Sequence, residues 1–266
     1  MKNFKNFKGK NSYNIDDLLE IMAILRKKCP WDKQQTHSSV RINFLEEVYE
    51  VLEAIDSEDT ELLREELGDV LLQVVFHAQM ESEAGKFTFS DVCDEVCRKL
   101  IIRHPHIFGD TVAEDTAQVL ENWENIKNKT KGHETRTQEL EAVAKSLPAL
   151  MYAQKIGKRA AGAGLDFESE KQAFECIYKE LTELREAMDI PDRQAIENEL
   201  GDVLFSCVNT ARHLGIDAET ALRKSAEKFI KRFSNAETLI RQQEMLMQDL
   251  TAEELDKYWQ KAKETV

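Results

Sequence analysis

Both halves of this chain carry the same acidic pattern, and this duplication constrains the fold more than any other feature. Each copy has two glutamates three residues apart, followed further along by a glutamate and an aspartate that are also three residues apart. The copies are displaced by roughly 133 positions, which is typical of a tandem repeat. They comprise Glu47, Glu50, Glu66 and Asp69 in the first half and Glu180, Glu183, Glu199 and Asp202 in the second. The chain is therefore predicted to contain one structural unit twice.

Composition and periodicity predict that both units are all-α. Hydrophobic residues make up 42% of the 266 residues, only four prolines are present, and long segments show helical period. A chain of this length can hold two ordinary domains. We expect an N-terminal helical domain at 1–128, a polar linker at 129–146 and a C-terminal helical domain at 147–266. The expected architecture is a tandem repeat of helical bundles.

The periodic segments indicate where the helices lie. We expect them at 15–28, 40–56, 60–84, 90–103 and 117–127 in the first repeat, and at 147–161, 169–188, 194–214, 218–243 and 252–263 in the second. In the segment 40–56, apolar residues recur every three or four positions and are expected to face the core. These residues are Phe44, Leu45, Val48, Leu52 and Ile55. The stretch 70–78 is apolar nearly all round and is expected to lie inside a bundle.

Charge and cysteine content argue against several classes of protein. A net charge of −14 disfavours binding to nucleic acid, whose phosphates attract clustered lysine and arginine. There is no run of about 18 apolar residues and no apolar segment behind the basic N-terminus, so neither a membrane span nor a signal peptide is predicted. Five cysteines form an odd set without zinc-binding spacing, as expected in a reducing compartment. We therefore expect a cytoplasmic protein that does not associate with membranes.

The carboxylates of each copy are expected to meet at one site. Residues three apart share a helical face, so the two glutamates of each first pair converge, as do the glutamate and aspartate of each second pair. If the two helices pack antiparallel, four like charges come together, which is unfavourable unless a cation lies between them. Ligation by oxygen alone favours Mg²⁺, with Mn²⁺ as an alternative. The duplication predicts this site in both halves.

Two other interpretations of the acidic helices remain open. A glutamate-rich helix can simply present a solvated face, although the pair Glu66 and Asp69 leads directly into an apolar helix. A di-iron bundle also uses glutamates from facing helices, but it normally includes Glu-x-x-His on two of them. None of the six histidines lies three residues after a glutamate. The magnesium interpretation accounts for more of the pattern.

Basic and aromatic residues are duplicated as well. Each half has a basic pair one helical turn apart, followed by a Trp–Lys pair with the same spacing. These residues are Lys99, Arg103, Trp123 and Lys127 in the first half and Lys228, Arg232, Trp259 and Lys263 in the second. Lysine and arginine can bind phosphate oxygens and tryptophan can stack on a base, so the set fits a nucleoside polyphosphate such as ATP. The alternative is that the cations pair with the abundant glutamates and the tryptophans anchor helix packing.

These motifs resemble those of the MazG family of nucleoside triphosphate pyrophosphohydrolases, in its two-domain bacterial form. The resemblance spans nearly the full chain. In the first half it rests on Cys29-Pro30-Trp31-Asp32, Gln35-Thr36-His37, the Glu-Glu-x-x-Glu pattern at 46–50, Glu66-Leu67-Gly68-Asp69 and Arg103-His104-Pro105-His106. In the second half it rests on Glu199-Leu200-Gly201-Asp202, the basic pair within 228–232, and Trp259.

The resemblance implies an all-α fold whose dimers assemble helical bundles, and Mg²⁺-dependent cleavage of a nucleoside triphosphate between its α and β phosphates. It also implies that the C-terminal repeat is the main catalytic unit. In that repeat the metal ligands would be Glu180, Glu183, Glu199 and Asp202, and the nucleotide contacts would be Lys228, Arg232, Trp259 and Lys263. Lys179 departs from the family pattern, which usually has glutamate there, whereas Glu46 of the first repeat keeps it. On residue chemistry alone, the first-half carboxylates are equally good ligands.

The predicted reaction is attack of water at the α-phosphorus, with release of a nucleoside monophosphate and pyrophosphate. A carboxylate not fully committed to metal, Glu180 or Glu183, is expected to orient that water. The activity would serve nucleotide-pool housekeeping or a stress-related role. The alternative is a nucleotide-sensing or protein-binding helical module in which one or both acidic sites are vestigial. One repeat supplies few helices to enclose the site, so a partner is expected, either the sister repeat or a second chain. A second chain would make the protein a homodimer.

Overall fold

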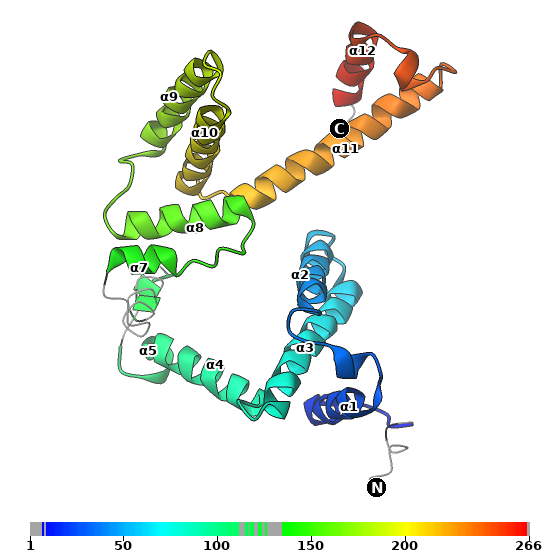
Figure 1. The fold of residues 1–266 in the computed structure, drawn as a ribbon, viewed down its shortest axis with the longest axis vertical. Helices are drawn as coiled ribbons and strands as arrows, with labels where there is room; N and C mark the ends of the chain where they lie inside the picture. The colour runs from blue at the N-terminus through cyan, green and yellow to red at the C-terminus, as the bar shows by residue number, and fades with distance from the viewer. Residues whose placement is uncertain are drawn as a thin grey trace. The chain divides into compact units, whose positions relative to one another are not determined.

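The computed structural model describes two long stretches of the chain and a few positions outside them. These are residues 9–111 and 135–264, with residues 7, 115, 116, 118, 119, 122, 123 and 126. Contacts divide the chain into two compact units, Met1–Lys127 and Asn128–Val266, and each is described by itself. Every regular element of the described stretches is helical (Figure 1). The all-α prediction is confirmed.

The first unit is built around a helical hairpin. Its elements are α1 (Ile15–Lys28), η2 (Asp32–Gln34), α2 (Arg41–Asp56), α3 (Thr60–Glu83), α4 (Phe89–Arg103) and α5 (Pro105–Phe108). Helices α2 and α3 form the hairpin, and α1 packs on α3 (Figure 1). The buried core of this unit comprises Met22, Val40, Val75, Phe76 and Met80. The core therefore lies along the second half of α3, where α1 meets the hairpin.

Local sequence signals fix where these helices begin and end. At the start of α1, the side chains of Asn14 and Asp17 each accept a hydrogen bond from the other's backbone N–H, which closes a capping box. Asp59 accepts two backbone N–H groups at the start of α3. Gly85 follows the end of α3 with a φ of 69°, a conformation that favours glycine. These signals are local, so the sequence alone already indicates the bounds.

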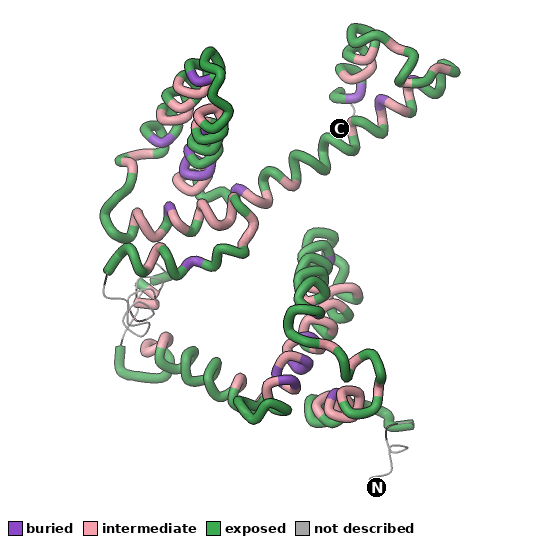
Figure 2. The backbone as a smooth tube through the Cα atoms, in the orientation of Figure 1, coloured by how far each residue is buried: buried purple, intermediate pink, exposed green. Residues whose placement is uncertain are grey.

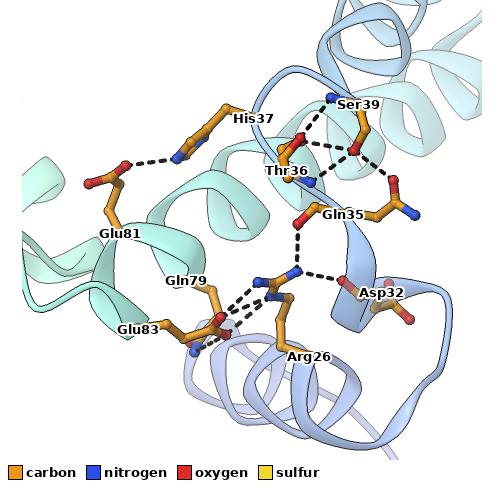
Figure 3. A network of polar contacts seen from close by, with 9 residues as sticks. All are labelled: Arg26, Asp32, Gln35, Thr36, His37, Ser39, Gln79, Glu81 and Glu83. Atoms are coloured by element: carbon orange, nitrogen blue, oxygen red, sulfur yellow. Dashed lines mark hydrogen bonds and ion pairs between the residues drawn. The ribbon is translucent and has the colours of Figure 1, made fainter.

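The loop between α1 and α2 is held by Arg26 (Figure 3). Its guanidinium donates to the main-chain oxygens of Asp32 and Gln35, and it pairs with Glu83 of α3, whose Oε2 lies 2.7 Å from Nη2. The short helix η2 supplies only one donor to these two carbonyls, the Gln35 N–H that bonds to the Asp32 oxygen, and the arginine donates to both. One side chain therefore ties the loop ahead of α2 to the end of α3.

The second unit repeats the hairpin. Its elements are α7 (Arg136–Glu141), α8 (Ala149–Gly162), α9 (Glu170–Met188), α10 (Arg193–His213), α11 (Ala218–Arg241), η3 (Met247–Asp249) and α12 (Ala252–Lys263). Helices α9 and α10 form the hairpin, α8 packs on α10, and α11 packs on α12 (Figure 1). Asp192 caps α10 as Asp59 caps α3, and Gly215 follows α10 with a φ of 69°. The repeat is thus present in the backbone as well as in the sequence.

The observed helices lie within about two residues of the ranges expected from periodicity. The expected helix at 117–127 lies mostly outside the described residues. Helix α7 falls within 129–146, where composition predicts a polar linker, and a capping box between Thr135 and Gln138 stabilises its start. None of the helices in the described stretches is both long and apolar enough to cross a bilayer.

The prediction that one whole face of α2 is covered is wrong for the single chain. Leu45, Val48, Leu52 and Ile55 expose 51%, 39%, 41% and 52% of their surface, and only Phe44 is half-buried. The reason is that, in the described part of the chain, α3 is the main neighbour of α2, and a single helix cannot cover an apolar face of this width. Figure 2 shows the α2 and α9 ribbons as exposed over most of their length.

The apolar stretch 70–78 is covered only in part. Val75, Phe76 and Ala78 are buried, as expected for a helix inside a bundle, but Leu71 is 39% exposed. The matching part of α10 behaves in the same way, because Val203 and Val208 are buried while Leu204 and Phe205 are exposed. Each hairpin therefore has apolar side chains that no described residue of the single chain covers.

Candidate active site

Three carboxylates of the first hairpin meet at one point. Glu47 lies on α2, and Glu66 and Asp69 lie on successive turns of α3. One oxygen from each side chain lies within 4.8 Å of the other two. The geometry follows from the sequence, because the spacing of three puts two carboxylates on one face of α3 and the hairpin turns that face toward α2. We call Glu47, Glu66 and Asp69 the first cluster.

The carboxylates of the first cluster perturb one another's ionisation. Burial, followed by repulsion from Asp69, raises the pKa of Glu47. Burial, followed by repulsion from Glu50, raises the pKa of Glu66. Like charges this close are relieved by a proton or by a cation. The first cluster is therefore suited to hold a positive ion.

A buried amide lies behind the first cluster. Gln73 of α3 is 7% exposed, and its Nε2 donates a hydrogen bond of 3.4 Å to Glu47 Oε1. Its Oε1 is buried and has no hydrogen-bond partner among the described residues. Buried amide oxygens normally have a partner. The amide that contacts Glu47 through its nitrogen therefore still has an acceptor oxygen available for a water molecule or an ion.

Three carboxylates of the second hairpin meet in the same way. Glu180 lies on α9, and Glu199 and Asp202 lie on successive turns of α10. Their oxygens also lie within 4.8 Å of one another. We call these three residues the second cluster. The structure therefore brings together three of the four predicted ligands in each half.

The remaining carboxylate of each set lies at the edge of its cluster. Glu50 is outside the first group of three, although its charge still raises the pKa of Glu66. Glu183 is outside the second group, and its Oε1 lies 3.1 Å from the Nζ of Lys179. Lys179 also lies 3.7 Å from Glu180 Oε1. The two fourth carboxylates therefore differ, because Glu183 is paired with Lys179 whereas Glu50 has no ion pair with any described residue.

Both donor sets fit a hard divalent cation. Among the described residues, the two groups that could hold a metal consist of carboxylates alone. Magnesium and manganese prefer oxygen ligands, whereas a di-iron centre also needs histidine. The unpartnered oxygen of Gln73 belongs to the same ligand chemistry. These residues fit magnesium better than the di-iron alternative.

Comparison with known families assigns both clusters to one domain type. The profile of the MazG nucleotide pyrophosphohydrolase domain matches residues 35–108 and 168–236. The first segment contains the first cluster, and the second segment contains the second cluster. The chain belongs to the MazG family. The resemblance carried by the motifs is thereby confirmed, and it applies to both repeats.

Similar proteins from bacteria match over nearly the whole chain. A protein of Escherichia coli K12 named nucleoside triphosphate pyrophosphohydrolase is 44% identical over 256 residues, which are 94% of this chain and 97% of that protein. A Thermotoga maritima protein named nucleoside triphosphate pyrophosphohydrolase/pyrophosphatase MazG is 43% identical over 251 residues, 94% of this chain and 95% of its own. A Mycolicibacterium smegmatis protein with the same name as the first is 36% identical over 214 residues, 79% and 61% of the two chains.

The cations expected to bind nucleotide in the second MazG repeat lie on other helices. Lys228 and Arg232 lie on α11, and among the described residues neither bonds to the second cluster. Arg232 is half-buried, and its Nε has no partner. The Trp259 ring packs against Phe229 with centroids 4.9 Å apart, and Lys263 donates to a glutamine of its own helix. The single chain does not join these four residues to the carboxylates.

The corresponding residues of the first MazG repeat make local contacts. Lys99 Nζ lies 3.9 Å from Glu95 Oε1 on α4. The Arg103 guanidinium lies 5.3 Å from the centre of the Trp123 ring. Lys127 lies outside the described residues. Such contacts are those of ion pairs and packing anchors, and a nucleotide-binding role for these residues stays a prediction.

The sequence analysis missed the side chains that support the clusters from behind. Gln73 supports Glu47, and in the second repeat Cys176 Sγ lies 3.4 Å from Glu180 Oε1 and 3.6 Å from the Ser206 hydroxyl. Gln73 and Ser206 occupy matching positions of the repeat. A polar residue inside an otherwise apolar helix was a usable signal, because such a residue normally needs a buried partner.

Proposed function

We propose that the protein hydrolyses nucleoside triphosphates to nucleoside monophosphates and pyrophosphate, with Mg²⁺ or Mn²⁺ held by the carboxylate clusters. The observation that carries this proposal is the presence of three converging carboxylates in each of the two segments that match the MazG domain. The E. coli and T. maritima relatives named as pyrophosphohydrolases align with 94% of this chain, which supports the same reaction here. The net charge of −14 fits a small anion bound through a metal better than nucleic acid.

The roles of the side chains follow from their places. Glu180, Glu199 and Asp202 would hold the metal in the C-terminal repeat, which we take as the main catalytic domain, at 147–266. A bound divalent cation supplies Lewis acidity toward phosphate oxygens and lowers the pKa of a coordinated water. Glu183, which lies outside the group of three, is free of that ligand set to accept the proton of the attacking water. Water oxygen then bonds to the α-phosphorus as the bond to pyrophosphate breaks.

The binding of nucleotide needs more than one hairpin. Lys228 and Arg232 would contact the phosphates and Trp259 the base, and they would reach a cluster only through a rearrangement or a second chain. The apolar faces of α2 and α9 that the single chain leaves exposed support a homodimer, because exposed apolar surface of this extent marks a protein interface. Five free cysteine thiols are in keeping with a cytoplasmic protein. The activity would serve nucleotide-pool housekeeping or a stress response.

The deciding experiment incubates the protein with Mg²⁺ and each of several nucleoside triphosphates and measures pyrophosphate against orthophosphate. We expect pyrophosphate and nucleoside monophosphate in equal amounts. Glu199→Gln should lower the rate at least about 100-fold, because it removes a ligand charge. Glu66→Gln applies the same change to the first cluster and tests whether activity resides there instead. Glu61→Gln, at an exposed ion pair of α3, is the control and should leave the rate unchanged.

Two outcomes would contradict the proposal. Orthophosphate as the main product would indicate a phosphatase rather than cleavage between the α and β phosphates. Nucleotide that binds with Mg²⁺ and survives intact would favour the nucleotide-sensing alternative, in which the acidic sites are vestigial. Circular dichroism of each variant checks that a lost rate is not a lost fold.

A further inference from the structure

The two clusters have the same kinds of carboxylate ligand, but the residue beside them differs in charge. The residue before the first ligand is Glu46 in the first repeat and Lys179 in the second, at matching positions. Lys179 Nζ lies 3.1 Å from Glu183 Oε1 and 3.7 Å from Glu180 Oε1, so it bridges the two carboxylates of α9. The second cluster therefore already has a cation beside it.

The first cluster has no such cation. No ion pair joins Glu47, Glu66 or Asp69 to a basic side chain in the described part of the chain. Oxygens of these three carboxylates nevertheless lie within 4.8 Å of one another. The Gln73 side chain contacts Glu47 through its Nε2, and its buried Oε1 has no hydrogen-bond partner among the described residues. Both observations indicate that a positive ion and its ligand sphere would complete this site.

The side chains that contact the two clusters from behind also differ between the repeats. Behind the second cluster, the Ser206 hydroxyl and the Cys176 thiol form a chain that ends on Glu180. That chain leaves neither side-chain atom without a partner. Glu180 thus has both a thiol and a lysine as partners, whereas its counterpart Glu47 has the Gln73 amide and no cation among the described residues.

We propose that the two repeats bind divalent cations unequally. The first cluster binds a cation in the absence of nucleotide. The second cluster, whose glutamates are already paired with Lys179, binds one only together with a triphosphate. This inference rests on the proposed function, because it assigns metal to both clusters. A triphosphate brings additional negative charge and its own oxygen ligands, and the side chain of Lys179 is 67% exposed, so it is able to turn from the carboxylates toward the phosphates.

The expected difference in cation affinity between the two clusters is large enough to measure. Replacing a cation by an anion beside a doubly charged ion changes the affinity by about tenfold, even with the dielectric constant of water and with screening at physiological ionic strength. The chain offers a reciprocal pair of changes at matched positions. Lys179→Glu gives the second repeat the pattern of the first, and Glu46→Lys gives the first repeat the pattern of the second.

The test is a titration of the full chain with Mn²⁺ alone, in which electron paramagnetic resonance measures free Mn²⁺. The wild type should show one tight site per chain and a second site at least about tenfold weaker. Glu66→Gln should remove the tight site and Glu199→Gln should retain it. Lys179→Glu should yield two tight sites, and Lys179→Gln should give the second site an intermediate affinity. Glu46→Lys should leave no tight site. A triphosphate analogue with a methylene group between its α and β phosphates should tighten the second site.

The inference is overturned if the wild type binds two Mn²⁺ ions equally tightly, or if Lys179→Glu leaves the second site unchanged. Pyrophosphate release by the same preparation would then leave the proposed function intact. If neither cluster binds Mn²⁺, even with the analogue present, the metal assignment of both proposals fails. Circular dichroism of Glu46→Lys must match that of the wild type, so that a lost site reports charge rather than unfolding.

Discussion

The loop ahead of the carboxylate hairpin is held from opposite directions in the two units. In the first unit, Arg26 of α1 reaches forward to the loop and to Glu83 at the far end of α3 (Figure 3). In the second unit, Arg212 of α10 reaches back to Asp166 in the loop, and His213 bonds to the same carboxylate. The ligands are the same kind in both units, but their scaffolding is not. Metal ligation requires carboxylates at fixed spacing, whereas a loop can be fixed by any well-placed donor.

The largest expected effect comes from removing these two arginines. Arg26→Ala removes the guanidinium from the main-chain oxygens of Asp32 and Gln35 and from the carboxylate of Glu83, which should lower the free energy of unfolding of the first unit by about 2–4 kcal/mol. Arg212→Ala should lower the free energy of unfolding of the second unit by a similar amount. Hydrogen exchange read by mass spectrometry should show lost protection in α2 and α3 for the first variant, and in α9 and α10 for the second.

The control for both variants is Arg64→Ala. The Arg64–Glu61 pair of α3 is exposed at both ends, so its removal should cost less than about 0.5 kcal/mol. If Arg26→Ala changes exchange no more than this control, the loop is held by other contacts. If each arginine variant loosens both hairpins equally, the two units do not unfold independently and the comparison between them fails.

A smaller effect is expected from acid on the second unit. The Arg212 guanidinium holds the pKa of Asp166 well below its usual range. A carboxyl group whose pKa is lower in the folded chain than its unfolded value of about 3.9 stabilises the fold fully above that value, and the contribution is lost as pH falls through the folded pKa. We expect this ion pair to contribute about 1–2 kcal/mol to the free energy of unfolding, because the Asp166 side chain is partly solvated. The difference in Tm between wild type and Arg212→Ala should therefore shrink below about pH 4.

A constant difference in Tm between pH 6 and pH 3 would contradict this prediction. It would mean that Arg212 stabilises the unit through packing or through Asn209 rather than through the charge of Asp166. The Tm difference caused by Arg26→Ala should shrink less in acid, because two of the Arg26 acceptors are main-chain oxygens that do not titrate and only Glu83, whose pKa Arg26 lowers, does.

Sequence patterns predicted the fold and the clusters for the same physical reason. Helical period and capping residues such as Asn14 and Asp59 are local signals, so they fix the helices without reference to the rest of the chain. The spacing of Glu66 and Asp69 is also local, and one hairpin suffices to bring Glu47 to them. Features within a helix, or between helices joined by a short turn, could be read directly from the sequence.

Features that depend on distant packing could not be read in this way. Periodicity identified the apolar face that contains Leu45 and Leu52, but it does not say which surface covers that face. The pattern of Lys228 and Arg232 does not say which cluster these cations reach, because α11 is joined to α10 by a turn that the pattern does not orient. The contact of Gln73 with Glu47 was missed although both lie in one hairpin, because the matching residue of the second repeat is Ser206 and the duplication therefore does not mark Gln73.

The smallest expected effect on stability comes from the close packing of α8 against α10. Gly157 of α8 is buried, and a Cβ added there would lie 2.6 Å from Asn209 Oδ1 and 3.3 Å from Arg212 Nε. The matching position of the first unit is Ile24, so only the second unit uses a glycine at this contact. Asn209 is buried and accepts a hydrogen bond from Arg212, so it has little room to yield.

Gly157→Ala should therefore lower the free energy of unfolding by about 1 kcal/mol, since the clash outweighs the higher helix propensity of alanine. Gly162→Ala on the same helix is the matched control, because its added Cβ meets nothing within 4 Å and should leave stability equal or slightly higher. Urea unfolding of both variants measures the difference. If Gly157→Ala is as stable as Gly162→Ala, then Asn209 can move aside, and the anchor formed by Arg212 and Asp166 does not depend on close packing of α8.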